Sequence, residues 1–180
     1  MNLSYMNPTY TFPLNKLYDP AYLCRFAKRN NLKDYAYGFE IIYPYTYTVT
    51  TLKLGRSASK FLGERIYRQA AWLPGWNQPQ PSSSAGSDIN NIKTLWMQEY
   101  SVYEDDWTKN NFVIKVWDVT GFPNDSQDEA RNSRLAENLL LDEYESVHGC
   151  LPIGNPKDTR NEMMRHEVKN SHWNNLFVED

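Results

Sequence analysis

The segment YAYGFEIIYPYTYTVTTLKL, residues 35 to 54, restricts the fold of this 180-residue chain more than any other stretch. It is dense in tyrosine, isoleucine, threonine and valine, which fit the pleated, half-buried surface of a β-sheet. We expect two strands, at about residues 36 to 43 and 46 to 54, with a tight connection near Pro44. Gly55 is expected to end the second strand. The chain is therefore built around a sheet rather than around helices alone.

Three segments with helical periodicity surround this strand pair. Residues 19 to 31 form the first of them. The second begins at Ser57 or Ser59 and continues to about residue 71. The third runs from about residue 126 to 147, and Gly149 follows its end as a typical helix-terminating residue. These patterns predict helices on both sides of the two strands in sequence.

The segment NNFVIKVWDVTG, residues 110 to 121, alternates apolar and polar residues and predicts another strand. A long polar loop is expected at 74 to 91, and residues 92 to 100 fit either a strand or a short helix. This order predicts an α+β fold with a small three-stranded, mainly antiparallel sheet flanked by helices. The expected organisation is one domain over residues 1–180, with a core at about 35–156, an N-terminal helical extension at 1–34 and a charged C-terminal tail at 157–180.

Composition excludes several classes of protein. With 41% hydrophobic residues the chain has enough apolar side chains for a core, so we do not expect disorder throughout. It contains no apolar run of about 18 residues and starts without a charged-then-apolar leader, so we expect no membrane insertion and a cytoplasmic location. Cys24 and Cys150 lie far apart without ligand-like spacing, which argues against a zinc site or a disulfide framework.

The segment KLGRSASKFLGERIYR, residues 53 to 68, gathers five basic residues around a single acid in a chain of formal net charge -3. A local basic stripe can bind nucleic acid even when the protein is acidic overall. Such a run is also typical of a solvated helix face, and the same holds for the basic segments at 25 to 33 and 157 to 169. Charge density alone leaves both interpretations open.

Two charged residues fall on the apolar faces of predicted helices. Glu137 lies inside the apolar arc of the third helix when the helix is wound at about 100° per residue. The apolar members of this arc are Ala136, Leu140, Leu141, Tyr144 and Val147. A carboxylate there binds a cation, pairs with an Arg or Lys, lines a cleft, or reaches water at the edge of the stripe. Arg65 lies in the same way on the second helix, where it lays its stem over the core or joins Glu137 in one site suited to a phosphodiester.

These residues resemble the GIY-YIG nuclease superfamily over roughly residues 37 to 156. The family pattern is two short strands with the GIY and YIG signatures, a helix with an Arg, a later strand, a helix with a Glu, and a Gly-Asn pair. LKLGRS matches the second signature, with Lys53 in place of its tyrosine, as in members similar to restriction enzymes. FEIIYPY contains no literal Gly-Ile-Tyr, and by spacing Tyr43 takes the place of its tyrosine, with Tyr45 as a rival. The remaining matches are Arg65, Glu137 and Asn155.

The resemblance implies a metal-dependent DNA endonuclease that hydrolyses phosphodiester bonds with one Mg²⁺ or Mn²⁺ ion. In it, Glu137 would hold the metal ion. Tyr43 would help to take the proton from the attacking water, with positive charge nearby from Lys53. Arg65 would bind the scissile phosphate. The implied catalytic set is Tyr43, Lys53, Arg65 and Glu137, and the implied DNA contacts are Arg56, Lys60, Arg68 and Asn155.

The resemblance extends to phage and bacterial enzymes of the restriction or homing type, which implies a bacterial cell or a phage-infected host. Because one active site cuts one strand at a time, a double-strand break would need a homodimer or two successive nicks. Two other classes of function stay open. One is a nucleic-acid-binding module without catalysis, in which Trp72 and Trp76 stack on bases. The other is a phage or host interaction protein, which the pI of about 5.6 favours.

Overall fold

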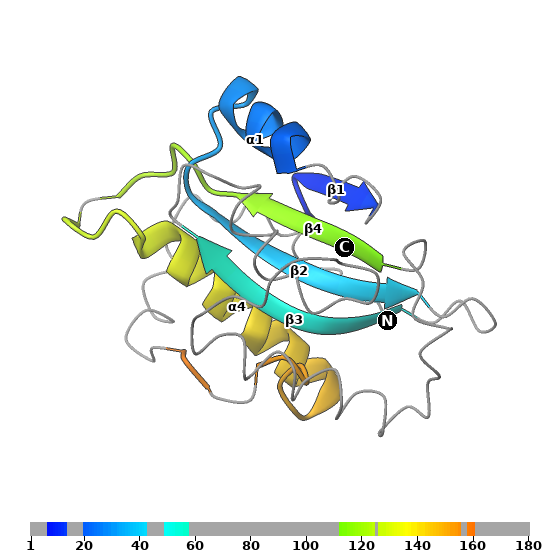
Figure 1. The fold of residues 1–180 in the computed structure, drawn as a ribbon. Coiled ribbons are helices and arrows are strands. Elements are labelled where there is room, and N and C mark those ends of the chain that lie inside the picture. Colours follow the sequence, from blue (N-terminus) through cyan, green and yellow to red (C-terminus); the bar gives the residue numbers. More distant parts are fainter. Residues whose placement is uncertain are drawn as a thin grey trace, which may run out of the picture.

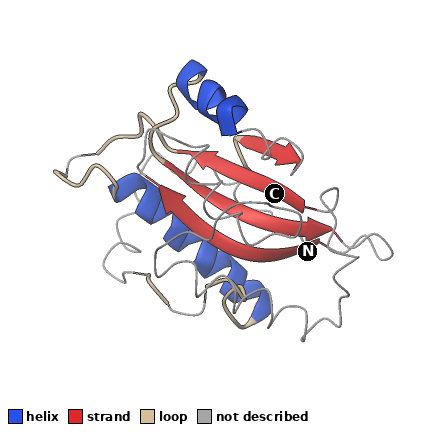
Figure 2. Cartoon of the chain, in the orientation of Figure 1, coloured by secondary structure: helices blue, strands red, loops and turns tan. Residues whose placement is uncertain are grey.

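The computed structural model describes residues 7–13, 20–42, 49–57, 112–124, 126–155 and 158–160. Within them the strands form one antiparallel sheet in the order β1-β4-β2-β3, accompanied by two helices (Figures 1 and 2). The elements are β1 (Tyr10–Pro13), α1 (Pro20–Arg29), β2 (Tyr35–Ile42), β3 (Val49–Ser57), β4 (Phe112–Asp118) and α4 (Arg131–His148). The fold is therefore α+β with an antiparallel sheet, as the sequence predicts.

The described sheet has four strands, so the expected number of three is wrong. The additional strand, β1, lies in the segment that we expected as a helical extension, and it pairs with β4 from Tyr10↔Val116 to Pro13↔Val113. With four residues it is too short to show a periodicity of its own. Phe12 gives it an anchor, because this side chain is buried and its ring lies 5.0 Å from the ring of Phe26 in α1.

The two strands of the Tyr-rich segment pair as expected, but β3 lies further along the chain than predicted. It continues to Ser57, so the expectation that Gly55 ends the strand is wrong. Gly55 lies opposite Tyr37 in the register, and a Cβ at Gly55 would lie 2.7 Å from the Tyr37 ring. The glycine is thus a place where a strand makes room for a buried aromatic ring, rather than a turn.

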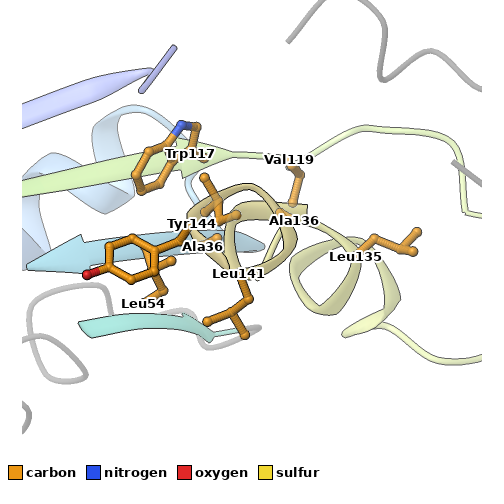
Figure 3. Packing of buried hydrophobic residues seen from close by; sticks show 9 residues of the cluster. Ala36, Leu54, Trp117, Val119, Leu135, Ala136, Leu141 and Tyr144 are labelled. Atoms are coloured by element: carbon orange, nitrogen blue, oxygen red, sulfur yellow. The ribbon is translucent and has the colours of Figure 1, made fainter. Parts of the chain in front are cut away.

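The helix α4 crosses one face of the sheet and forms a core with all three long strands (Figure 1). Its apolar residues pack against Ala36 of β2, Leu54 of β3 and Trp117 of β4, as Figure 3 shows. The buried members on the helix are Leu135, Ala136, Leu140, Leu141 and Tyr144. Val147, which we expected on the same arc, is 42% exposed because it lies in the last turn of the helix.

The start of α4 also differs from the prediction, since the helix begins at Arg131 rather than near residue 126. Side chains in the preceding segment bind nearby backbone groups instead. The Asn124 Oδ1 accepts from the Ser126 N–H, and the Asp128 Oδ1 accepts from the Ala130 N–H. Such local bonds compete with helical ones and delay the first turn. Gly149, in the left-handed conformation, ends the helix as predicted.

The opposite face of the sheet carries a second set of aromatic side chains. Tyr35, Tyr37 and Phe39 of β2 are fully buried. They alternate with Ala36, which faces α4, and so point away from that helix. The predicted helix at 19 to 31 is confirmed as α1, which packs on this second face through contacts of Phe26 with Phe12.

Several predicted elements lie outside the described residues. They are the connection near Pro44, the helix to about residue 71, the loop at 74 to 91, the segment at 92 to 100 and most of the tail. The tail residue Arg160 is described, and its guanidinium binds Asp158, Asp142 and Glu145, which ties this point of the chain to α4. None of the helices in the described part of the chain has the length and apolar character that a membrane span requires.

Candidate functional site

The first charge that the sequence singled out, Glu137, lies against the sheet beside Arg56. The Arg56 Nε is 3.2 Å from the Glu137 Oε2. The side chain of Glu137 is 13% exposed and that of Arg56 is 33% exposed. Glu137 stands next to the buried Ala136 on α4, and Arg56 stands two residues after Leu54 on β3, so core packing of both elements fixes the pair. Of the alternatives for Glu137, the structure shows pairing with an arginine.

Arg56 also influences a second carboxyl group, that of Asp34, which directly precedes β2. Burial raises the pKa of Asp34 above its ordinary value of 3.8, because desolvation penalises the charged form. Hydrogen bonds from the side chain and backbone of Ser133 and the positive charge of Arg56 oppose this rise in pKa, while Asp118 adds to it. Arg56 therefore pairs with Glu137 of α4 and also influences Asp34, the residue just before β2.

The backbone around Asp34 is fixed by the end of β4. The Thr120 Oγ1 accepts from the backbone N–H groups of Lys33 and Asp34 and donates to the Asp34 carbonyl oxygen. The Val119 N–H donates to the same carbonyl oxygen. These bonds place Asp34 at the end of the sheet where β3 and β4 also end, which brings it near Arg56.

The donor capacity of Arg56 exceeds what the described contacts use. A guanidinium has five N–H donors, and the described ion pair with Glu137 lies at Nε. In the described part of the chain no hydrogen bond engages the terminal nitrogens of Arg56, and the side chain is one-third exposed. An anion with several oxygens, such as a phosphate, matches this planar set of donors.

Lys53, the expected catalytic lysine, lies on the other face of the sheet from Glu137. It pairs with Phe39 across the strands and alternates with Leu54, which faces α4. The structure thus brings Arg56 rather than Lys53 to Glu137. Lys53 has contacts of its own, and its Cβ lies 2.7 Å from where a Cβ at Gly154 would be.

Asn155, expected as a DNA contact, holds the outer edge of β3. Its Oδ1 accepts from the Leu54 N–H at 2.9 Å, and its Nδ2 donates to the Leu54 carbonyl oxygen at 2.8 Å. The Gly154 N–H donates to the Leu52 carbonyl oxygen at 2.7 Å. The amide therefore pairs with β3 in the way a neighbouring strand would, and the Gly-Asn pair covers the edge of the strand that carries Lys53 and Arg56.

The sequence patterns did not single out a second ion pair, which joins β2 and β4 on the sheet face that faces α4. The Lys115 Nζ is 2.9 Å from the Glu40 Oε2, and these side chains are 19% and 5% exposed. Glu40 occurs within the otherwise apolar strand β2, and Lys115 alternates with Val116 so as to share the face of Trp117. The signal that could have predicted this pair is the presence of one charged residue among the apolar residues of each strand. Each of these two buried charges thus has the other as its partner, which avoids the cost of burying an unpaired charge.

The other predicted site residues lie outside the described part of the chain. These are Tyr43 with its rival Tyr45, Lys60, Arg65 and Arg68. Their convergence on Glu137 stays a prediction. Of the expected set, the structure places Lys53, Arg56, Glu137 and Asn155, and among these it brings Arg56 and Glu137 together.

The donor set at Glu137 limits the kind of metal site that is compatible with it. Among the described residues, no three side chains of His, Cys, Asp or Glu come together to hold an ion. Mg²⁺ is commonly bound by one or two carboxylates together with substrate phosphate and waters. A single carboxylate next to a guanidinium fits an ion that is shared with a phosphate, and does not fit one that the described residues bind alone.

Comparisons with known proteins found no relative of this chain. No family model matches the chain, and no curated protein or solved structure matches it either.

Proposed function

We propose that this protein is a DNA endonuclease similar to the GIY-YIG nucleases, which hydrolyses phosphodiester bonds with one Mg²⁺ or Mn²⁺ ion. The order of the described elements supports the proposal. Two paired strands, β2 and β3, precede a later strand, β4, then a helix with a glutamate, α4, and then the pair Gly154 and Asn155. This is the order in which the family pattern places its motifs.

The pair of Arg56 with Glu137 is the observation that carries the proposal. It joins the strand of the second signature to the helix of the family's glutamate, with 3.2 Å between Nε and Oε2. Both side chains are partly exposed, at 33% and 13%, so a substrate can reach them. Hydrolysis of a phosphodiester needs a cation that binds the phosphate oxygens and a carboxylate that holds a metal ion, and this pair contains both groups.

In this proposal Glu137 holds the metal ion and Arg56 binds a non-bridging oxygen of the phosphate through its terminal nitrogens. A bound ion would supply charge neutralisation and lower the pKa of a water. In the hydrolysis a water oxygen would form a new bond to phosphorus, one backbone P–O bond would break, and the leaving oxygen would receive a proton. Tyr43 and Arg65 keep the roles that the resemblance implies, whereas Arg56 takes the place of Lys53 as the cation beside Glu137. In this proposal the protein acts on DNA in the cytoplasm of a bacterial cell or a phage-infected host. A homodimer would allow both strands to be cut.

Nicking of supercoiled plasmid tests this function. Wild-type protein should nick the plasmid with Mg²⁺ or Mn²⁺ and not with EDTA. Glu137→Gln keeps the shape of the side chain and removes its charge, so nicking should fall by about 100-fold or more. Glu129→Gln is the matched control, because Glu129 is an exposed glutamate just before α4, and it should nick like the wild type. Equal nicking by the wild type and Glu137→Gln would refute the assignment.

A second candidate is a nucleic-acid-binding module without catalysis. It is favoured by the neutralisation of Glu137 by Arg56, which weakens a carboxylate as a metal ligand. Anisotropy of a labelled duplex separates the two candidates. Tight binding together with no nicking under Mg²⁺, Mn²⁺, Co²⁺ or Ni²⁺ supports the module, whereas metal-dependent nicking excludes it.

A further inference from the structure

Helix α1 and the turn after it form an exposed basic surface outside the candidate site. Residues 20 to 33 contain four basic residues and no acidic one, in a chain of formal net charge -3. Arg25, Lys28, Arg29 and Lys33 are all exposed. Lys28, Arg29 and Lys33, here called the α1 basic surface, make no ion pair with a described residue. Among the described residues, these three cations are thus not neutralised by an ion pair.

The apolar residues of the same segment fix this surface in place. Ala27 is 2% exposed and Leu32 is 1% exposed, and the ring of Phe26 packs edge-on against Tyr10 and Phe12 of β1. The Leu32 N–H donates to the Ala27 carbonyl oxygen at 2.9 Å, so the chain folds back over the end of the helix. Lys33 follows directly. The cations thus project from a rigid element rather than from a loose terminus.

The last residue of the α1 basic surface, Lys33, is adjacent in sequence to Asp34 at the end of the sheet where the candidate site lies. Lys33 is followed by Asp34, whose pKa is influenced by Arg56, the partner of Glu137. The Lys33 N–H is also bound to Thr120, which holds Asp34 at the end of the sheet. A long polyanion that reaches both Arg56 and α1 would have to pass this end of the sheet, where Lys33 lies.

We propose that the α1 basic surface binds the phosphate backbone of duplex DNA next to the site at Arg56 and Glu137. This inference rests on the proposed function and extends it, since it assigns a docking surface to a segment that precedes the Tyr-rich strands. We favour a phosphate backbone as the partner because it offers regularly spaced negative charges to exposed cations in a segment that contains no acid. The surface gives affinity without base specificity, since its contacts are to phosphates.

The salt dependence of DNA binding tests this surface. Anisotropy of a labelled 30-bp duplex is measured in EDTA, where no cutting occurs, for the wild type and for Lys28→Gln/Arg29→Gln/Lys33→Gln. Each lost phosphate contact reduces the slope of log K against log salt by about 0.9, so the triple variant should lose about 2 to 3 from the slope. Between 50 and 200 mM salt the wild type should then lose roughly 40-fold more affinity than the variant.

Arg134→Gln is the matched control, because Arg134 is a surface cation already paired with Asp128 at 3.1 Å. It should change the slope by much less than the triple variant. An unchanged slope in the triple variant, with a melting curve like that of the wild type, overturns the inference. Wild-type protein that binds no DNA at 25 mM salt overturns both proposals, whereas binding with the expected slopes and no nicking supports the surface and removes the endonuclease alone.

Discussion

Replacing Gly154 with alanine tests whether the loop after α4 holds β3 in position. An added Cβ would lie 2.5 Å from the Leu52 carbonyl oxygen and 2.7 Å from the Lys53 Cβ. Both belong to a strand that is paired along its other edge with β2. Since a paired strand in a packed sheet has little room to move, the loop has to shift away from it.

The cost follows from the hydrogen bonds that the loop would lose. They are the bond from the Gly154 N–H to Leu52 at 2.7 Å and the two bonds between Asn155 and Leu54 at 2.9 and 2.8 Å. A net contribution of about 1 kcal/mol for each gives about 3 kcal/mol for a fully detached loop. In a protein of this size that corresponds to a fall in Tm of about 6 to 12 °C.

Urea denaturation followed by far-UV circular dichroism measures this cost, and Gly149→Ala provides the matched control. Gly149 has φ +72° with nothing within 4 Å of an added Cβ, so alanine there meets only the strain of the left-handed conformation, about 1 kcal/mol. Adding Asn155→Ala to Gly154→Ala should cost little more, because the bonds of Asn155 are already lost. A smaller loss of unfolding free energy for Gly154→Ala than for Gly149→Ala, or fully additive losses in the double variant, would refute the idea that this loop holds β3 in position.

Three further predictions concern the stability contributions of Gly55, Arg160 and Asp34. Gly55→Ala should cost about 1 to 3 kcal/mol in urea denaturation, because its Cβ would lie 2.7 Å from the fully buried Tyr37 ring; a cost below about 0.5 kcal/mol would contradict this packing. Arg160→Met should cost about 2 kcal/mol by leaving three carboxylates together, and the loss should shrink at 1 M salt, where their repulsion is screened; a loss that is independent of salt would argue against the cluster. The raised pKa of Asp34 means that its carboxyl group favours the folded state when protonated, so wild-type stability should gain from this group as the pH falls through the folded pKa towards 3.8. Asp34→Asn should lack this gain, and identical pH profiles from denaturation at several pH values would contradict the assignment.

Local patterns were sufficient to predict the elements that form the core. The alternation in FVIKVWD predicted β4, and the apolar arc on the late helix predicted which face of α4 is buried. The same arc identified Glu137 as a charge that needs a partner, and the structure supplies Arg56. Burial follows from residue type and period, so these features are encoded within single segments.

Local patterns could not predict features that depend on contacts between distant segments. Asn155 binds Leu54 across 101 positions of sequence, and β1 becomes a strand because β4 offers it an edge. Nothing in YTFP or GCLPIGN by itself indicates these partners. Tertiary pairing decides such short segments, and intrinsic preference contributes little to them.

The register of β3 determines which basic residue belongs to the candidate site. Side chains on a strand alternate between faces, so a shift of one residue exchanges the entire set that faces a helix. Leu54 faces α4 in the structure, and Arg56 therefore shares its face while Lys53 lies on the other. The resemblance assigned the catalytic charge to Lys53 from its position in the second signature. With Gly55 opposite Tyr37 in the register, the cation beside Glu137 is Arg56, and under the proposed function we expect phosphate binding at this site to depend on Arg56 first.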